Sequence, residues 1–466
     1  MGRQKELIFN TLIIGIGKFS TQVVSVFLLP MYTSILSTSE YGTYDLLYTI
    51  AMFLIPIITL LMEESMFRFL IDSKDSEESS KIISQTLIFC IISTSIWIII
   101  TCIVGKIIQL QYTFIFCFYI ISSITVSLRN AVIRGKGKIK EYTIINSITS
   151  ILIIGLNIIF IVGLKIGIVG LFLSSIISNL FVSIIAFSKL KIFNGVSIKK
   201  YDKSLMKEMV KYSIPLVPNS ISWSIINFSD RIVVSTVLGT GQNGIYSMAN
   251  KFPTYIDNIY NFFYTAWKEA SAKALHYEKP EEFYNSIYNS LRKFLDAVVL
   301  GSIALLPFIF SFFIKKDFSD AYKYVPILII ATYFSNLSSF IGGIFTAYKD
   351  TKIIGKTTIV AAILNLTINI LFIRYIGLWA AAISTLVSML INYSLRTKRI
   401  KKYLRLTCDY KIFVSFIFLI LDLISFYNSN IIINIINFFI ILCYCIFINK
   451  NIILELYKWI RNKIKK

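Results

Sequence analysis

The sequence predicts an all-α membrane protein with about fourteen transmembrane helices, and composition and hydropathy lead to this fold class. Of the 466 residues, 56% are hydrophobic and only 15% are charged, and the mean hydropathy is +0.72. Soluble domains carry about 25% charged residues because they must face water. Apolar stretches long enough to form membrane spans recur along the whole chain. We expect these stretches to be helices, because the bilayer core offers no partner to an open sheet edge.

Each predicted span is long enough, at about 1.5 Å per residue, to cross a hydrocarbon core about 30 Å thick. The first begins near Leu12 and has no small-residue cleavage site, so we interpret it as a retained span and not as a signal peptide. The predicted spans are residues 11–36, 44–62, 82–104, 107–128, 143–164, 166–188, 213–238, 244–267, 294–314, 324–347, 353–373, 377–395, 411–427 and 431–449.

The distribution of basic residues predicts the orientation of these spans. The net charge is +22, and 38 of the 47 Lys and Arg residues lie in or beside the segments that are cytoplasmic if the N-terminus is inside. Only six lie in the segments that are then outside. Cytoplasmic loops carry an excess of Lys and Arg, which face anionic headgroups. We therefore expect both termini in the cytoplasm, and we attribute the charge to the membrane and not to nucleic acid.

Several enzymatic functions lack the residues that they require. The chain contains no GxxxxGK[ST] phosphate-binding loop. Its one histidine, His276, would have to serve any Ser-His-Asp triad or histidine-based metal site, and its six cysteines lack metal-ligand spacing. The longest predicted outer loop, near 314–323, is too short for a catalytic domain. We expect a protein that is not an enzyme and that holds no metal or cofactor.

The chain also contains an internal repeat of six spans. Leu36, Thr38, Gly42 and Tyr44 recur at a constant offset of 202 residues. The recurring residues are Leu238, Thr240, Gly244 and Tyr246. Because six is an even number of spans, both copies have the same orientation, as in transporters that bind substrate at the interface between repeats. We expect an N-lobe over 1–200, a C-lobe over 201–400, and a C-terminal helix pair with a basic tail over 401–466.

Motifs in the seventh and eighth predicted spans indicate a family. The chain resembles bacterial oligosaccharide (O-antigen, Wzx-type) flippases of the multidrug/oligosaccharidyl-lipid/polysaccharide flippase superfamily. The motifs are Ile214-Pro-Leu-Val-Pro-Asn219, Asn227-Phe-Ser-Asp-Arg231, Gly244-Ile-Tyr-Ser-Met-Ala-Asn-Lys251 and Ala266-Trp267.

The resemblance implies an activity and partners. Such proteins move an undecaprenyl-pyrophosphate-linked oligosaccharide from the cytoplasmic to the outer leaflet by alternating access, for surface polysaccharide assembly. The expected location is the bacterial cytoplasmic (inner) membrane. The expected partners are the lipid-linked oligosaccharide, membrane lipids, a polysaccharide polymerase and assembly proteins. In the related lipid II flippases the two final helices help to form a groove for the lipid tail.

Three cations inside predicted spans are candidate ligands for the pyrophosphate: Lys18, Arg231 and Lys251. Charges inside membrane spans are energetically unfavourable and usually face a polar cavity. A guanidinium can bind a diphosphate in a bidentate manner and an ammonium adds a point charge. Structural ion pairs, or long side chains that reach the headgroups, explain the same residues.

Two carboxylates and two prolines complete the candidate site. Asp230 and Asp257 could compensate charge or couple transport to a proton or Na⁺ gradient. Pro215 and Pro218 should kink the seventh span and are candidates for gating. A static kink and a helix-packing hydrogen bond are the structural alternatives.

Two other functions of the same superfamily stay open, namely a multidrug/cation antiporter and a lipid II flippase. An antiporter needs acidic cavity residues for cationic drugs, whereas the intramembrane charges singled out above are three cations against two carboxylates. The sequence does not identify the sugar, the coupling ion or the oligomeric state.

Overall fold

The computed structural model describes residues 28–454 apart from 108, 110, 192–194, 276, 408–410, 429 and 451–453. Every regular element in this part of the chain is helical. The chain divides into two compact units, Met1–Gly244 and Ile245–Lys466. The fold class predicted from the sequence is therefore confirmed.

The first unit packs its helices around one apolar core, to which α3, α4, α5, α6 and α8 contribute. Its helices are α2 (Leu29–Ile35), α3 (Thr38–Thr59), α4 (Met62–Asp72), α5 (Ser76–Ile107), α6 (Thr113–Gly135), α7 (Ile139–Asn157), η1 (Ile158–Gly163), α8 (Gly167–Lys189), η2 (Ile198–Lys200), α9 (Lys203–Ser213), η3 (Ile214–Leu216) and α10 (Val217–Leu238).

The boundary between the units falls inside α11 (Thr240–Ala249). The second unit has its largest apolar cluster among α12, α13 and α14. Its helices are α12 (Lys251–Ala274), α13 (Pro280–Phe313), η4 (Lys316–Tyr324), α14 (Val325–Ala347), α15 (Thr351–Ile376), α16 (Leu378–Ile400), α17 (Lys411–Asn428) and α18 (Ile431–Ile448).

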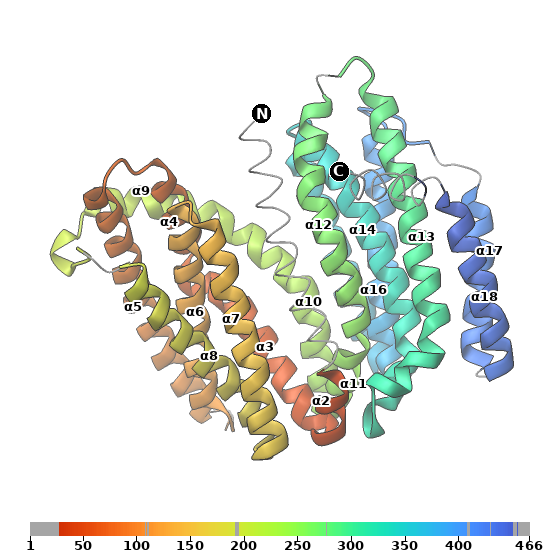
Figure 1. Cartoon of the computed structure of the whole chain (residues 1–466), viewed down its shortest axis with the longest axis horizontal. Coiled ribbons are helices and arrows are strands. Elements are labelled where there is room, and N and C mark those ends of the chain that lie inside the picture. The colour runs from red at the N-terminus through yellow and green to blue at the C-terminus, as the bar shows by residue number, and fades with distance from the viewer. Residues whose placement is uncertain are drawn as a thin grey trace, which may run out of the picture. The chain divides into compact units, whose positions relative to one another are not determined.

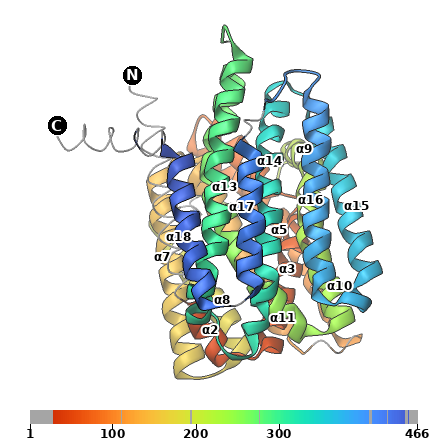
Figure 2. The same ribbon diagram turned by 90° about the vertical axis from the view of Figure 1, so that its right-hand side faces the viewer.

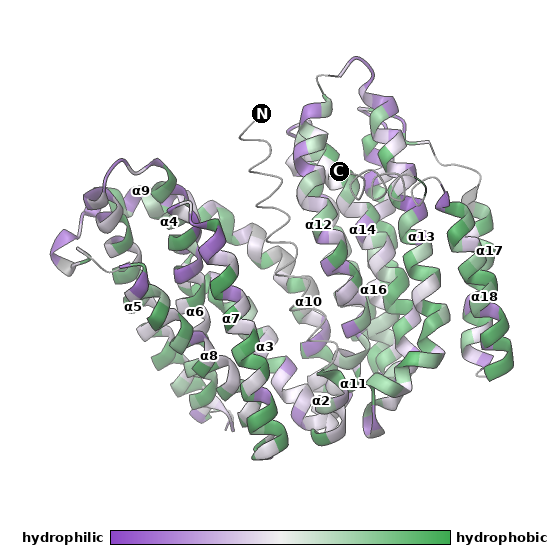
Figure 3. Ribbon diagram, in the orientation of Figure 1, coloured by the Kyte–Doolittle hydropathy of each residue, from purple (hydrophilic) through white to green (hydrophobic). Residues whose placement is uncertain are grey.

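Ten helices of the described residues are long and apolar enough to cross a membrane, and α17 contains a shorter apolar stretch. The most polar of the predicted spans are α10 and α12, where hydrophilic residues interrupt the apolar surface (Figure 3). Most of the first predicted span, 11–36, lies outside the described residues. The number of fourteen spans and the cytoplasmic termini stay predictions.

Segments expected to be loops are helical in several places. The predicted cytoplasmic loop 268–293 is largely formed by the end of α12 and the start of α13. With 34 residues, α13 is about 51 Å long, so it extends well beyond a hydrocarbon core of about 30 Å. The predicted outer loop 314–323 forms the 3₁₀-helix η4, and the loop 189–212 contains α9.

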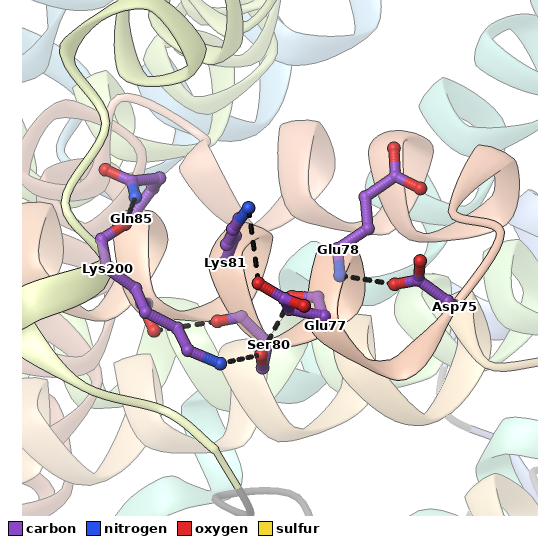
Figure 4. A network of polar contacts seen from close by, with 8 residues as sticks. Asp75, Glu77, Glu78, Ser80, Lys81, Gln85 and Lys200 are labelled. Carbon is purple, nitrogen blue, oxygen red and sulfur yellow. Dashed lines mark hydrogen bonds and ion pairs between the residues drawn. The ribbon is translucent and has the colours of Figure 1, made fainter.

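A polar network fixes the segment that connects α8 to α9 (Figure 4). Lys200 Nζ donates to Ser80 Oγ over 2.8 Å, and Gln85 Nε2 donates to the carbonyl of Lys200 over 2.8 Å. Lys81 also pairs with Glu77 over 3.5 Å on the exposed face of α5. The connection between the two predicted repeats is thus bound to the beginning of α5.

One buried arginine joins three helices in the first unit. Arg129 of α6 is fully buried and has no carboxylate partner among the described residues. Its guanidinium donates to Asn146 Oδ1 over 2.9 Å and to Thr149 Oγ1 over 3.3 Å, both on α7. It also donates to Ser183 Oγ of α8 over 3.2 Å. Neutral oxygens thus replace the water that a guanidinium would otherwise bind.

The second unit contains a corresponding arrangement. Arg396 of α16 is 2% exposed and donates to Thr357 Oγ1 and Thr358 Oγ1 of α15, each over 3.0 Å. It donates as well to the Ser338 carbonyl of α14 over 2.8 Å. In each unit, therefore, a buried arginine joins the fourth, fifth and sixth helices of the predicted repeat, although the arginine lies on the fourth helix in one and on the sixth in the other.

A carboxylate attaches the C-terminal helix pair to the rest of the second unit. Asp296 of α13 accepts from Tyr333 of α14 over 2.7 Å and from Ser415 of α17 over 2.8 Å. Ser415 in turn contacts the hydroxyl of Tyr444 on α18 over 2.7 Å. Figure 2 shows α17 and α18 beside α13, against which both helices pack. The buried Asp296 side chain thus joins three helices directly, and Ser415 extends the connection to α18.

Replacing Arg129 with Ala should destabilise the first unit. The change removes charge-assisted hydrogen bonds to two neighbouring helices and leaves their oxygens buried without a donor, so we expect a loss of about 2–4 kcal/mol. At about 2–4 °C per kcal/mol, the thermal midpoint of the detergent-purified protein should fall by roughly 5–10 °C. The control is Arg374→Ala at an exposed arginine, which should leave the midpoint nearly unchanged. Equal midpoints for the two variants would show that the network contributes little.

Candidate functional site

The candidate site lies on one face of α3, where this helix packs against α10 and the beginning of α11 (Figure 1). All of the contacts described here involve residues up to Gly244 and belong to the first unit. The face is formed by Thr38, Gly42, Asp45 and Phe53. These residues are separated by 4, 3 and 8 positions, which places them on one side of a helix.

Two glycines allow the backbones to touch. A Cβ at Gly42 would collide with the Thr240 carbonyl and the backbone nitrogen of Gly244. A Cβ at Gly244 would collide with the Thr38 carbonyl. Close approach of this kind through small residues is a common form of helix contact in membranes.

This crossing has the symmetry of the sequence repeat. Thr38 and Thr240 are repeat equivalents, and so are Gly42 and Gly244. Each glycine therefore meets the threonine carbonyl of the other repeat. The repeated Thr-x-x-x-Gly pattern is the sequence signal of this contact. The glycine of each copy leaves the space that the threonine carbonyl of the other copy occupies.

Side chains extend the contact on both sides of the glycines. Asn243 Nδ2 donates to the Gly42 carbonyl over 2.8 Å, and the hydroxyls of Ser39 and Thr240 are 2.8 Å apart. Further along α3, the rings of Phe53 and Phe228 stack with centroids 4.6 Å apart and planes 1° from parallel.

An ion pair lies between the glycine crossing and the stacked rings. Arg231 Nε of α10 donates to Asp45 Oδ2 of α3 over 2.7 Å. The side chains are only 18% and 10% exposed. Removing one member of a buried pair is strongly destabilising, because the other charge is left without compensation. The pair therefore favours contact between α3 and α10.

Asp45 is the main residue of this site that sequence reasoning missed. It lies at the edge of the predicted span 44–62, where a carboxylate is easily interpreted as interfacial. The available signal was its position three residues after Gly42, which puts both on one helix face. With Asp45 included, the charges singled out for the site become three cations and three carboxylates, so their balance no longer distinguishes a phosphate carrier from a cation carrier.

The other residues predicted for the site have different positions. Asp230 is 4% exposed on α10, beside Arg231 in sequence. Lys251 is the first residue of α12 and Asp257 lies one to two turns later, facing Asn336 of α14. Both belong to the second unit. Lys18 lies outside the described residues.

The backbone is irregular at the two prolines before and in α10. The α-helix ends at Ser213, a single 3₁₀ turn follows over Ile214–Leu216, and α10 begins at Val217. Pro215 lies in the 3₁₀ turn and Pro218 near the start of α10, where a missing N–H is tolerated. The seventh predicted span, 213–238, is therefore interrupted by one turn near its start. A role in gating stays a prediction.

A second backbone irregularity lies at the C-terminal end of α3. Leu60 and Leu61 have φ values of 48° and 54°, in the left-handed region that non-glycine residues rarely adopt. They separate α3 from α4, whose residue Glu63 is buried. The helix that carries Asp45 thus ends at a sharp and strained joint.

The arrangement joins α3 to α10 and α11 through an ion pair and a close crossing of backbones. Within the described ranges, no cluster of three or more His, Cys, Asp or Glu side chains could hold a metal ion. The contact places the Arg231 guanidinium, paired with Asp45 and 18% exposed, next to the crossing of α3 and α11.

The chain was compared with known families and sequences. The model of a family described as polysaccharide biosynthesis protein matches residues 7–267, which is more than half of the chain. No curated protein resembles the chain closely enough in sequence to count as a match.

Solved structures share the fold at low sequence identity. The lipid II flippase MurJ in an inward closed conformation is 17% identical, with 95% of this chain and 100% of that chain covered and a TM-score of 0.71. An inward-facing multidrug resistance MATE family transporter of the MOP superfamily is 15% identical, with 83% and 98% covered and a TM-score of 0.68. A MOP superfamily transporter from Pyrococcus furiosus is 16% identical, with 84% and 95% covered and a TM-score of 0.57.

A disulfide should form across the helix crossing. In a variant without the native cysteines, Ser39→Cys and Thr240→Cys would place two thiols where hydroxyls are 2.8 Å apart. We expect mild oxidation to link them, as measured by mass spectrometry of the linked peptides and by loss of free thiols. Adding Gly42→Val should reduce the yield, because the new side chain collides with the Thr240 carbonyl. An equal yield with and without the Gly42→Val change would contradict the close crossing.

Proposed function

The chain belongs to the polysaccharide biosynthesis protein family, and from this membership we propose that it is a flippase for an undecaprenyl-pyrophosphate-linked oligosaccharide. The substrate would pass from the cytoplasmic to the outer leaflet of the bacterial cytoplasmic membrane by alternating access, for surface polysaccharide assembly. The family match carries the proposal. The fold shared with structures titled lipid II flippase and multidrug transporter supports a transport role.

The proposed mechanism centres on exchange at Arg231. In the described state Arg231 is paired with Asp45. A pyrophosphate carries more negative charge than one carboxylate and accepts bidentate hydrogen bonds from a guanidinium. Binding of the diphosphate would therefore compete with Asp45 and weaken the contact between α3 and α10. The contact between α3 and α10 would thus form without substrate, when Arg231 binds Asp45. It would open with substrate, when Arg231 binds the diphosphate.

The remaining predicted residues have supporting roles in this proposal. Lys18 and Lys251 would add cationic contacts to the pyrophosphate. The 3₁₀ turn at Pro215 would let α10 change direction as its contact with α3 is released. Asp230 or Asp257 would couple the return to a proton or Na⁺ gradient. Transport by the Asp230→Asn and Asp257→Asn variants, each with and without the gradient, separates these two candidates.

An apolar groove supports a site for the lipid tail. A cavity of about 390 Å³ in the second unit is lined mainly by aliphatic and aromatic residues of α13, α14, α16 and α17. Its one acidic residue is Asp296, which holds α17 in place. Of the two final helices, α17 lines this cavity, which supports the proposal that an apolar groove here receives the lipid tail.

Cells that lack the protein should accumulate complete lipid-linked oligosaccharide units on the cytoplasmic leaflet. The measurement is extraction and mass spectrometry of the glycolipids, combined with a membrane-impermeant label that reports the leaflet. Accumulation of lipid II instead would favour a lipid II flippase. Normal glycolipids with lost resistance to cationic compounds would contradict the proposal and favour a drug antiporter.

Replacing Arg231 with Ala should reduce transport at least about tenfold, because a charged hydrogen bond of about 1.5–3 kcal/mol to the phosphate is lost. Membrane level and topology should stay normal. The same change also leaves Asp45 unpaired, so the matched control is the neutral double variant Asp45→Asn with Arg231→Gln. If Arg231 binds substrate, the double variant stays inactive although its thermal midpoint is restored. Recovery of transport by the double variant would mean that the pair is only structural.

A further inference from the structure

A polar cavity of the second unit lies between the beginning of α15 and the end of α16, far from Arg231 in sequence. Its volume is about 550 Å³. The lining residues are Ile353, Leu395, Lys398, Arg399 and Lys402. The described part of its lining thus combines three cations with two aliphatic side chains and includes no carboxylate.

The three cations are exposed and make no ion pair in the described part of the chain, whereas Arg396 on the same helix is buried and hydrogen-bonded to neighbouring helices. Lys402 lies over the ring of Tyr403, 5.2 Å from its centroid. Asp350, three residues before Ile353, accepts a hydrogen bond from the Tyr403 hydroxyl over 2.8 Å. Within the described residues, the positive charge of the cavity is therefore not neutralised by an ion pair.

The surrounding sequence has the same charge. Residues 348–356 and 395–407 together contain nine Lys or Arg residues and one carboxylate, Asp350. The distribution of basic residues predicts that this end of α15 and α16 is cytoplasmic. Anionic lipids give that leaflet a negative surface potential, which attracts basic side chains near the membrane.

Apolar side chains continue along α15 beyond the cavity. Val360, Ile363 and Ile370 are 42%, 59% and 54% exposed. Exposed aliphatic side chains on a membrane helix face the hydrocarbon of the bilayer. A ligand with an anionic head and long chains could therefore place its head among the cations and its chains along this surface.

We propose that this cavity binds the phosphate headgroup of an anionic bilayer phospholipid, with Arg399 as a bidentate donor and Lys398 and Lys402 as point charges. The acyl chains would lie along α15. The site is independent of the proposed transport activity, because its evidence comes from a different cavity and its ligand is a component of the membrane. Bound lipid would fill the gap at the cytoplasmic ends of α15 and α16.

The test uses the purified full chain in detergent and native mass spectrometry. The probes are dioleoylphosphatidylglycerol and, as the zwitterionic comparison, dioleoylphosphatidylcholine. The variant Lys398→Gln/Arg399→Gln/Lys402→Gln removes the three cations. The matched control, Lys203→Gln/Lys207→Gln/Lys211→Gln, removes the same charge from the exposed face of α9. A third variant, Lys398→Arg/Lys402→Arg, keeps the charge of the cavity.

We expect the native chain to retain phosphatidylglycerol at least about tenfold more tightly than phosphatidylcholine. The cavity variant should lose this preference, while the α9 control and the arginine variant should keep it. Equal losses in the cavity variant and the α9 control would overturn the proposal, because binding would then follow net charge. Displacement of the lipid by millimolar inorganic phosphate would overturn it in favour of a phosphate site without lipid recognition. Displacement by undecaprenyl phosphate at lower concentration than by phosphatidylglycerol would overturn it by assigning the cavity to the substrate.

Discussion

The constraint on which the structure depends is that a charge buried between helices must be compensated by the protein itself. Arg129 and Arg396 meet it with neutral oxygens from neighbouring helices, and Asp296 meets it with hydroxyl groups. In each case the compensating groups lie on neighbouring helices, so those helices cannot separate without leaving a buried charge uncompensated. These charged residues therefore hold the helices of each unit together.

Arg231 meets the same constraint in a different way. The Asp45 carboxylate on α3 is paired with it, and both side chains keep some exposure. The arginines of the buried networks, in contrast, are 0% and 2% exposed, so a ligand has almost no access to them. In the proposed cycle, the ion pair of Arg231 with Asp45 is broken and formed again. This difference in exposure distinguishes the arginine proposed to act in transport from Arg129 and Arg396, which join helices.

The sequence predicted the fold class and the long apolar helices of the described chain, because each span carries its own hydropathy signal. It also indicated a repeat, whose residues Gly42 and Gly244 meet at the crossing. It did not predict the pairing of Asp45 with Arg231, since the two residues are 186 positions apart and no local pattern indicates which helices face each other. Nor did it predict helix lengths beyond the membrane, because α9 and the ends of α12 and α13 are too polar for a hydropathy signal.

A paired arginine suits the proposed transport cycle better than a free one. A free guanidinium in a weakly hydrated cavity would bind a diphosphate strongly and would release it slowly on the other side. With Asp45 available, release of substrate is accompanied by formation of the ion pair, so the two states differ less in free energy. A ligand shifts a conformational equilibrium only by its difference in affinity for the two states. In the proposed mechanism Asp45 creates that difference, because it occupies Arg231 only when α3 and α10 are in contact.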